Sequence, residues 1–162
     1  MTTTTASAGR TFTIPSIVHR LDPIVRAALR LGVPMGPNIL LTVRGRRSGE
    51  ARTVPVAILR TEAGEFLFSP FGEVAWVQNL RAAGHAELRH GRRRRSVDAV
   101  EMRPSDAATQ LEAGMRDVLR APLFGPMIAG WYGITAASTS ADYLVAAGLH
   151  PGFALSDRVT AA

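Results

Sequence analysis

Apolar and polar residues alternate through the middle of the chain, which is the pattern of β-strands. In 38–44, Ile39, Leu41 and Val43 share one face of the expected strand, whereas 52–59 is apolar on both faces, as a central barrel strand would be. With the turn residues between such segments, the pattern predicts six strands, at 38–44, 52–59, 66–69, 85–90, 93–102 and 151–156.

A helical period replaces the alternation elsewhere, and it predicts helices at 22–31, 73–83, 104–120 and 139–147. Asp22 and Pro23 have the residue types of an N-cap and a first helical position, and Gly32 is a typical stop. Apolar residues before Asp22 extend the apolar face of this first helix backwards. The helix is either a lid packed on the core or a basic amphipathic helix that makes a peripheral membrane contact. The glycine- and proline-rich segment 121–137 has no clear period.

The order of these elements predicts an α+β fold. Antiparallel hairpins with one inserted helix, and no strand–helix–strand alternation, indicate a small, mostly antiparallel β-barrel with helices packed outside. Pro55 inside its strand predicts a bulge or a free edge at that position. The length of 162 residues predicts a single domain over 16–162, after a disordered N-terminal tail over 1–15.

The amino-acid composition limits the kinds of reaction and binding site that the chain can support. The net charge is +6, every basic residue other than histidine is arginine, and there is no cysteine. Disulfides, thiolate catalysis and cysteine metal sites are therefore excluded, and the four scattered histidines predict no metal site. The positive charge favours anionic partners. The start of the chain lacks the apolar core of a signal peptide, and we expect a cytoplasmic protein.

The segment GRRSGEAR (45–52) is a basic turn between two expected strands. Glycine allows backbone amides to face a ligand, and arginine supplies a permanent forked charge. This combination suits a cofactor that carries a phosphate or a carboxylate, and the alternative is a solvated basic turn.

Two motifs in order carry a resemblance to a known family. LLTVRGRRSGEARTVPVAIL is followed by FLFSPFGEVAWVQNLRAAGHAEL, and together they span about residues 38–102. They resemble the deazaflavin (coenzyme F-420)-dependent nitroreductase family, with its G-R-[KR]-[ST]-G-x-x-R-x-x-P turn and strand and its W-x-x-N-L-[KR]-A helix. The N-terminal helix and the closing HPGFAL give weaker support.

The resemblance implies a split β-barrel related to flavin-binding barrels. It also implies an oxidoreductase that uses reduced F-420, an 8-hydroxy-5-deazaflavin with a phosphate and an acidic glutamate tail. The hydride acceptor would be a small organic molecule such as a quinone, a nitro compound or an activated double bond, and the assembly a homodimer. FMN is the alternative cofactor. A non-redox protein that binds a cofactor or lipid, and a cofactor-independent biosynthetic enzyme that reuses the barrel pocket, are the alternative functions.

The matching positions imply a cofactor site. Arg47 and Arg52 correspond to the phosphate-binding positions, and the other implied positions are Ser48 and Gly49 in the turn, Thr53, Val54 and Pro55 beside the ring, Ser69 after the third strand, and Trp76 and Asn79 on the closing helix. The loop 69–72 is shorter than in the family and lacks its lysine. No catalytic residue is evident, so Tyr132 or a water is the candidate proton donor.

The run Arg92–Arg95 has two interpretations. It is either a charged edge strand that resists aggregation, or a docking stripe for the glutamate tail or an acidic partner. It lacks the aromatic residues that single-strand binders use, so nucleic acid is not an expected partner.

Overall fold

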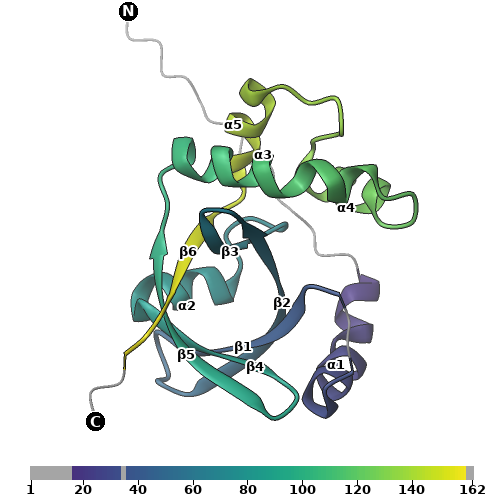
Figure 1. The fold of residues 1–162 in the computed structure, drawn as a ribbon. Coiled ribbons are helices and arrows are strands. Elements are labelled where there is room, and N and C mark those ends of the chain that lie inside the picture. Colours follow the sequence, from purple (N-terminus) through teal and green to yellow (C-terminus); the bar gives the residue numbers. More distant parts are fainter. Residues whose placement is uncertain (1–15, 34–35, 160–162) are drawn as a thin grey trace, which may run out of the picture.

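The computed structural model describes residues 16–33 and 36–159, with side chains from residue 23 onward. The tail expected at 1–15 lies outside the described residues. The elements are, in chain order, α1 (Ser16–Leu31), β1 (Asn38–Arg44), β2 (Ala51–Thr61), β3 (Gly64–Phe68), α2 (Ala75–Ala83), β4 (His85–His90), β5 (Arg93–Glu101), α3 (Pro104–Arg120), α4 (Gly125–Tyr132), α5 (Ser140–Leu149) and β6 (Gly152–Asp157) (Figure 1).

The six strands form one closed barrel in the order β1-β2-β3-β6-β5-β4, and each neighbouring pair is antiparallel. The predicted α+β class, an antiparallel barrel with helices outside, is confirmed. The β1–β4 ladder runs only from Leu40 opposite Arg89 to Thr42 opposite Glu87. Beyond Thr42 the two strands are no longer paired, which leaves a split beside the β1–β2 turn.

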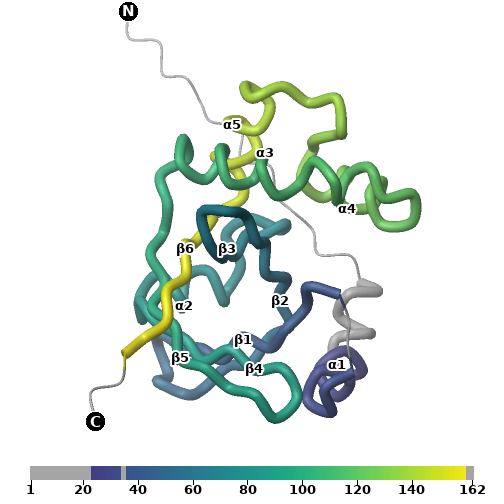
Figure 2. Tube along the Cα trace, in the orientation of Figure 1, coloured from purple at the N-terminus to yellow at the C-terminus, as the bar shows by residue number. Residues whose placement is uncertain are grey.

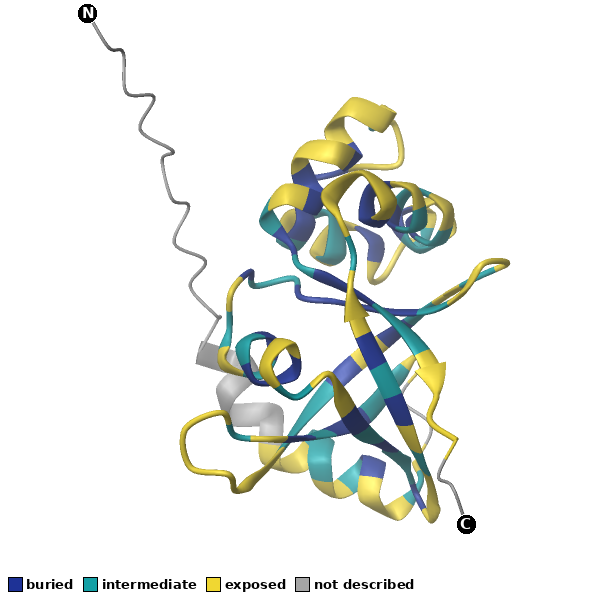
Figure 3. Cartoon of the chain, turned by 90° about the vertical axis from the view of Figure 1, so that its left-hand side faces the viewer, coloured by how far each residue is buried: buried dark blue, intermediate teal, exposed yellow. Residues whose placement is uncertain are grey.

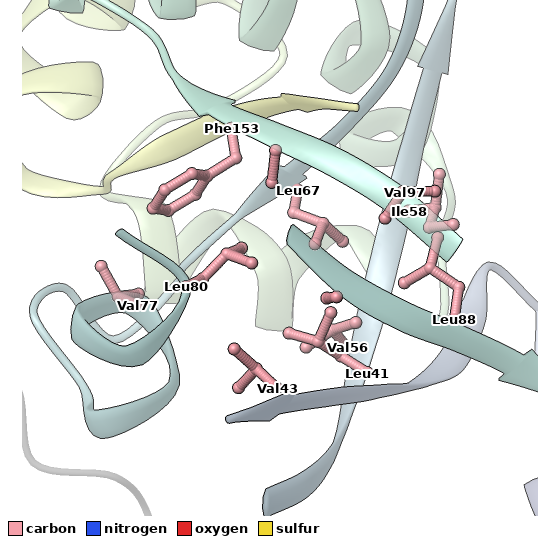
Figure 4. Packing of buried hydrophobic residues seen from close by; sticks show 12 residues of the cluster. Leu41, Val43, Val56, Ile58, Leu67, Val77, Leu80, Leu88, Val97 and Phe153 are labelled. Atoms are coloured by element: carbon pink, nitrogen blue, oxygen red, sulfur yellow. The ribbon is translucent and has the colours of Figure 1, made fainter. Parts of the chain in front are cut away.

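The barrel interior is filled by the inward-facing residues of the strands, as Figure 4 shows. Leu41 and Val43 of β1 lie there with Phe153 of β6. Helix α2 packs against β1, β4 and β5 and adds Val77 and Leu80 to the same core. Burial of these apolar side chains fixes α2 on the barrel, next to the turn that joins β1 and β2.

Helices α3, α4 and α5 form a second layer with its own core. Phe66 and Phe68 of β3 point outward and pack with Leu111 of α3 and Tyr143 of α5. Figure 3 shows this layer, with buried residues facing inward and exposed residues facing solvent. Helix α4 lies within 121–137, where the sequence pattern predicts no element.

Helix α1 packs against β1, β2 and β4, as the lid interpretation predicts. Its C-terminal end lies beside the β4–β5 hairpin (Figure 2), where the N–H of Gly91 donates to the carbonyl of Leu29 at 2.9 Å. A Cβ placed on Gly91 would be 3.0 Å from the Cα of Gly32, so the close approach of the two backbones favours glycine at both positions.

The predicted start of this first helix at Asp22 is wrong. The helix begins at Ser16 and contains Pro23 in its interior. A proline inside a helix removes one hydrogen bond, and its ring crowds the carbonyl four residues before it, so the packing of α1 on β1, β2 and β4 must offset this cost. None of the described helices has the length and hydrophobicity that a bilayer crossing requires.

The pairing of the strands decides the two edge predictions. Arg93–Arg95 pair with β4, whereas the pairing of β5 with β6 begins only at Val97, so this part of the run has a neighbouring strand on one side only, as the edge interpretation of Arg92–Arg95 predicts. The free edge predicted at Pro55 is confirmed, since Pro55 pairs with Leu40 of β1 while β2–β3 pairing begins only at Ile58. The missing N–H of Pro55 therefore costs no bond to β3.

Candidate functional site

The β1–β2 turn is held by its own backbone. The N–H of Gly45 donates to the carbonyl of Glu50 at 2.7 Å, and the N–H of Gly49 donates to the carbonyl of Gly45 at 2.8 Å. Gly49 has a φ of 71°, which favours glycine. The Ser48 hydroxyl accepts the N–H of Glu50 at 3.3 Å. The turn is exposed, with its shape defined independently of any ligand.

Asn79 of α2 anchors this turn to the barrel. Its Oδ1 accepts the backbone N–H of Arg46 at 3.1 Å and the Nη1 of the same residue at 3.2 Å. Asn79 is 6% exposed, between Val77 and Leu80 in the buried face of the helix. The structure thus joins Asn79 to the turn through Arg46, which is not among the implied cofactor-binding positions. Its signal in the sequence is the arginine that follows glycine in the G-R-[KR]-[ST]-G pattern.

The other two arginines of the turn are available to a ligand. Within the described part of the chain, the guanidinium of Arg47 has no hydrogen-bond or ion-pair partner. Arg52 pairs with Glu50 at 2.9 Å, but the side chains are 60% and 68% exposed, so this pair contributes little and can exchange. The turn therefore presents two guanidinium groups, those of Arg47 and Arg52, that the contacts within the fold leave available.

The implied ring-binding residues of β2 lie on two faces. Val54 packs against the barrel core. Thr53 and Pro55 lie on the outer face of the strand, and the Thr53 hydroxyl is 2.8 Å from that of Thr42. Only Thr53 and Pro55 could therefore contact a ligand outside the barrel.

Ser69 lies at the loop between β3 and α2 and is completely buried. Its hydroxyl donates to the carbonyl of Gly72 at 2.7 Å, and its N–H donates to the carbonyl of Pro151 at 3.0 Å. In this structure Ser69 shapes the loop, and its hydroxyl does not reach the surface.

Aromatic residues connect that loop and α2 to their surroundings. The ring of Trp76, which is partly buried, lies 6.2 Å from the ring of Phe153 in the barrel core. The ring of Phe71 lies 5.4 Å from that of Trp131 on α4. Arg81 braces α2 by bonding Glu73 at 2.7 Å and Glu101 at 2.5 Å. These contacts hold in place the helix that carries Asn79.

Tyr132, the candidate proton donor, lies in the core of the helical layer. It is buried, and burial raises its pKa well above the ordinary value, so its hydroxyl keeps its proton. Its ring is 4.8 Å from that of His150. Burial lowers the pKa of His150, against the opposing effect of backbone hydrogen bonds with Ser69 and Tyr132.

A cavity of about 460 Å³ opens in the split between β1 and β4 and reaches Gly49 of the turn. Arg44, His85 and Arg158 supply its basic groups. Arg44 and His85 lie inside the two motif segments but are not among the implied cofactor-binding positions. Arg158 comes from the far end of the chain, so sequence spacing could not bring the three together. Within 16–33 and 36–159 no cluster of acidic residues or histidines could hold a metal ion.

Solved structures share this fold at low sequence identity. The haem storage protein HutZ from Vibrio cholerae aligns with a TM-score of 0.51 and 14% identity, over 86% of this chain and 92% of that one. A domain-swapped dimer aligns with a TM-score of 0.50 and 18% identity, over 88% and 100%. An F420-H2 dependent reductase (FDR-A) aligns at 0.48 and 16%, over 74% and 94%. The first two likenesses show the barrel fold.

At the level of sequence, none of the curated proteins matches this chain. One protein family does match, and the matched segment includes the basic turn, α2 and the whole of α3. The family predicted from the two motifs is thereby confirmed. The sequence model of the F420H(2)-dependent quinone reductase family matches residues 24–121, more than half of the chain, and the chain therefore belongs to that family.

Proposed function

We propose that this protein is an oxidoreductase that binds reduced coenzyme F-420 and delivers hydride to a small organic acceptor of the quinone class. Nitro compounds and activated double bonds are the other acceptors that the sequence motifs imply. Family membership over 24–121 supports the cofactor, because that segment contains every implied cofactor-binding residue. The observation that carries the proposal is the basic turn, anchored through Arg46 to Asn79, with the guanidinium of Arg47 left without a partner among the described residues.

The turn fits the anionic part of this cofactor. The cofactor carries a phosphate and an acidic tail, and the turn offers the exposed arginines Arg47 and Arg52. Arginine binds phosphate through two parallel charge-assisted hydrogen bonds, which are stronger than neutral ones. The single nearby carboxylate, that of Glu50, is already paired with Arg52. The electrostatic balance of the turn therefore favours an anion.

The residues of the chain bind and position the cofactor, and the deazaflavin supplies the hydride chemistry when it is bound. Arg47 holds the phosphate, and Arg52 exchanges its weak contact with Glu50 for a stronger one. Asn79 fixes the turn and so keeps these donors in place. Pro55 and Trp76 exclude water from the ring. The proton that completes reduction comes from a water, because Tyr132 is buried with a raised pKa.

Fluorescence titration with F-420 tests this proposal, with FMN as the comparison ligand. We expect Arg47→Ala to weaken F-420 binding by roughly 1.5–3 kcal/mol, the value of a hydrogen bond to a charged group. Arg103→Ala is the control, since Arg103 is an exposed arginine at the N-cap of α3, outside the turn. Oxidation of reduced F-420 by a quinone then tests turnover. Tight binding of FMN but not F-420 would contradict the cofactor assignment, and binding without oxidation would leave a non-redox carrier.

A homodimer and a cytoplasmic location complete the proposal. A structure that aligns with this chain at 18% identity is a domain-swapped dimer, which supports the dimer as a working assembly. Light scattering of the purified protein measures the mass directly, and a monomeric mass at micromolar concentration would contradict it.

A further inference from the structure

His150 is a buried, titratable residue to which the proposed function gives no role. It is the C-cap of α5, it is 1% exposed, and it lies where α5, β6 and the loop between β3 and α2 meet. Burial of an imidazole costs free energy unless its nitrogen atoms find hydrogen-bond partners. The contacts of the ring therefore indicate what the residue does.

The ring of His150 holds the β3–α2 loop by its first residue, Ser69. Its Nδ1 lies 3.0 Å from the carbonyl oxygen of Ser69. A carbonyl oxygen can only accept a hydrogen bond, so Nδ1 carries a proton and donates it. The carbonyl of the next residue, Pro151, accepts the N–H of Ser69 at 3.0 Å. Both polar groups of the Ser69 backbone are thus bound by the segment 150–151.

The same ring contacts α4. The rings of His150 and Tyr132 have centroids 4.8 Å apart, and the imidazole also has a hydrogen bond with the backbone of Tyr132. Tyr132 is the last residue of α4 and lies in the core of the helical layer. His150 therefore links the β3–α2 loop to the helical layer, and the ring contact between Phe71 and Trp131 links them a second time.

The position of this loop matters for the edge of β2. Pairing between β2 and β3 ends at Ile58 and Leu67, two residues before Ser69. At Ser69 the chain is held on the β6 side, by residues 150–151. Within 36–159, the edge of β2 at Thr53 and Pro55 therefore has no partner strand on the side of the loop. These are the positions implied to lie beside the deazaflavin ring.

We propose that His150 is a positioning residue of the cofactor site. By holding the carbonyl of Ser69, it fixes the β3–α2 loop at the distance from the edge of β2 that admits the flat deazaflavin ring. The proposal rests on the proposed function, because it requires the ring at Thr53 and Pro55 and the phosphate at the β1–β2 turn. The side chain of His150 is buried and acts through Ser69, without contact to the ligand.

Loss of the contact between His150 and Ser69 should affect the ring more than the phosphate. The β1–β2 turn is held by its own backbone and by Asn79, through hydrogen bonds that do not involve the β3–α2 loop. The affinity for F-420, which depends mainly on the phosphate and its arginines, should therefore change little. The rate of hydride transfer depends on the placement of the reacting atoms, and a displacement of about 1 Å can lower a rate by up to about a hundredfold.

The test compares two substitutions of His150 in the full chain. Asparagine places an amide N–H close to the position of Nδ1, whereas leucine has no donor. We expect His150→Leu to lower the kcat for oxidation of reduced F-420 by a quinone by about tenfold or more, with less than about a threefold change in the Kd for F-420. His150→Asn should recover most of the rate. Each rate is divided by the concentration of cofactor-binding protein, so that a smaller folded fraction does not count as a slower reaction.

Met115→Ala is the control for stability. Met115 lies in the core of the same helical layer and takes no part in the hydrogen bonds at Ser69. We expect Met115→Ala to destabilise the layer and to leave the kcat per binding site unchanged. An equal loss of rate in Met115→Ala and His150→Leu would overturn the assignment, as would equal rates in His150→Leu and wild type, or a failure of His150→Asn to recover any of the loss.

Wild-type protein supplies a second measurement that needs no substitution. NMR spectra of the imidazole nitrogens should show a proton on Nδ1 of His150 at neutral pH, and a ring protonated on Nε2 alone would overturn the assignment. If wild-type protein binds and oxidises reduced F-420 while these comparisons fail, the proposed function stands without a role for His150. If wild-type protein does neither, the proposed function fails and the role of His150 fails with it.

Discussion

Asn79 and Arg46 are 33 positions apart in the sequence, and one side-chain oxygen joins them twice. The Oδ1 of Asn79 accepts the backbone N–H of Arg46 at 3.1 Å and its Nη1 at 3.2 Å. A buried amide thereby fixes the backbone of an exposed, basic turn. The asparagine of the W-x-x-N helix motif thus positions the basic turn.

Replacing Asn79 should affect both stability and binding. Asn79→Ala leaves the N–H of Arg46 without its acceptor, and we expect the free energy of unfolding to fall by about 1–3 kcal/mol. F-420 affinity should fall as well, because the turn is released. Denaturant unfolding and fluorescence titration measure the two effects.

Gln78→Ala is the control for that change, because Gln78 lies on the same helix and its side chain donates to the backbone carbonyl of Glu73. Asn79→Asp keeps the accepting oxygen and should recover part of both losses. An equal loss in Asn79→Ala and Gln78→Ala would show that the anchor has no special role.

Arg52→Ala should separate binding from stability. Its ion pair with Glu50 is exposed, so its removal should change the free energy of unfolding by less than about 1 kcal/mol. If Arg52 contacts the cofactor phosphate, F-420 affinity should nevertheless fall by tenfold or more. A loss of stability without a loss of affinity would place Arg52 in the fold and outside the site.

Gly49→Ala and Gly130→Ala should change stability in opposite directions. A Cβ on either residue meets no atom within 4 Å, so packing does not distinguish them. Gly49 has a φ of 71°, which costs an alanine about 1 kcal/mol, whereas Gly130 lies inside helix α4, where alanine should stabilise by about 0.4–1 kcal/mol. Thermal unfolding of both variants measures the contrast, and a shift of the same sign for both would refute it.

His150 should make stability fall at mildly acidic pH. Burial lowers its pKa below the ordinary value of 6.5, so the unfolded chain takes up a proton first as the pH falls. Stability should be fully present above pH 6.5 and decline below it, with a slope of at most about 1.4 kcal/mol per pH unit. Carboxyl groups with lowered pKa values, such as Glu65, act at lower pH.

The free energies of unfolding of wild type and His150→Gln, measured between pH 7.5 and pH 5, test whether His150 causes this loss of stability. We expect the variant to be less stable at neutral pH and to have a flatter slope across this range. Identical slopes would assign the acid sensitivity to other groups.

The sequence predicted the barrel well because strand alternation is a local signal. The strand Asn38–Arg44 and the helix Pro104–Arg120 have the predicted bounds, since each combines a clear period with a turn or proline at its boundary. Helix α4 was missed because its glycines and prolines resemble breaks. Gly125 is in fact required by packing, since a Cβ there would lie 2.4 Å from the carbonyl oxygen of Leu119.

The site was predictable only in part. The basic turn and the asparagine helix are contiguous motifs, so their residues could be read from spacing. The burial of Ser69 and the placing of Thr53 and Val54 on opposite faces depend on tertiary packing and strand register. The cavity between β1 and β4 brings His85 and Arg158 together from distant parts of the chain, and no local pattern links them.

The backbones of Gly32 and Gly91 lie against each other without an intervening side chain. This contact sets the distance between the end of α1 and the β4–β5 hairpin. A Cβ on Gly91 would lie 3.0 Å from the Cα of Gly32, so the end of α1 would have to move by a few tenths of an ångström. Arg30 lies two residues before that contact, so a substitution at Gly91 would shift its side chain together with the helix end.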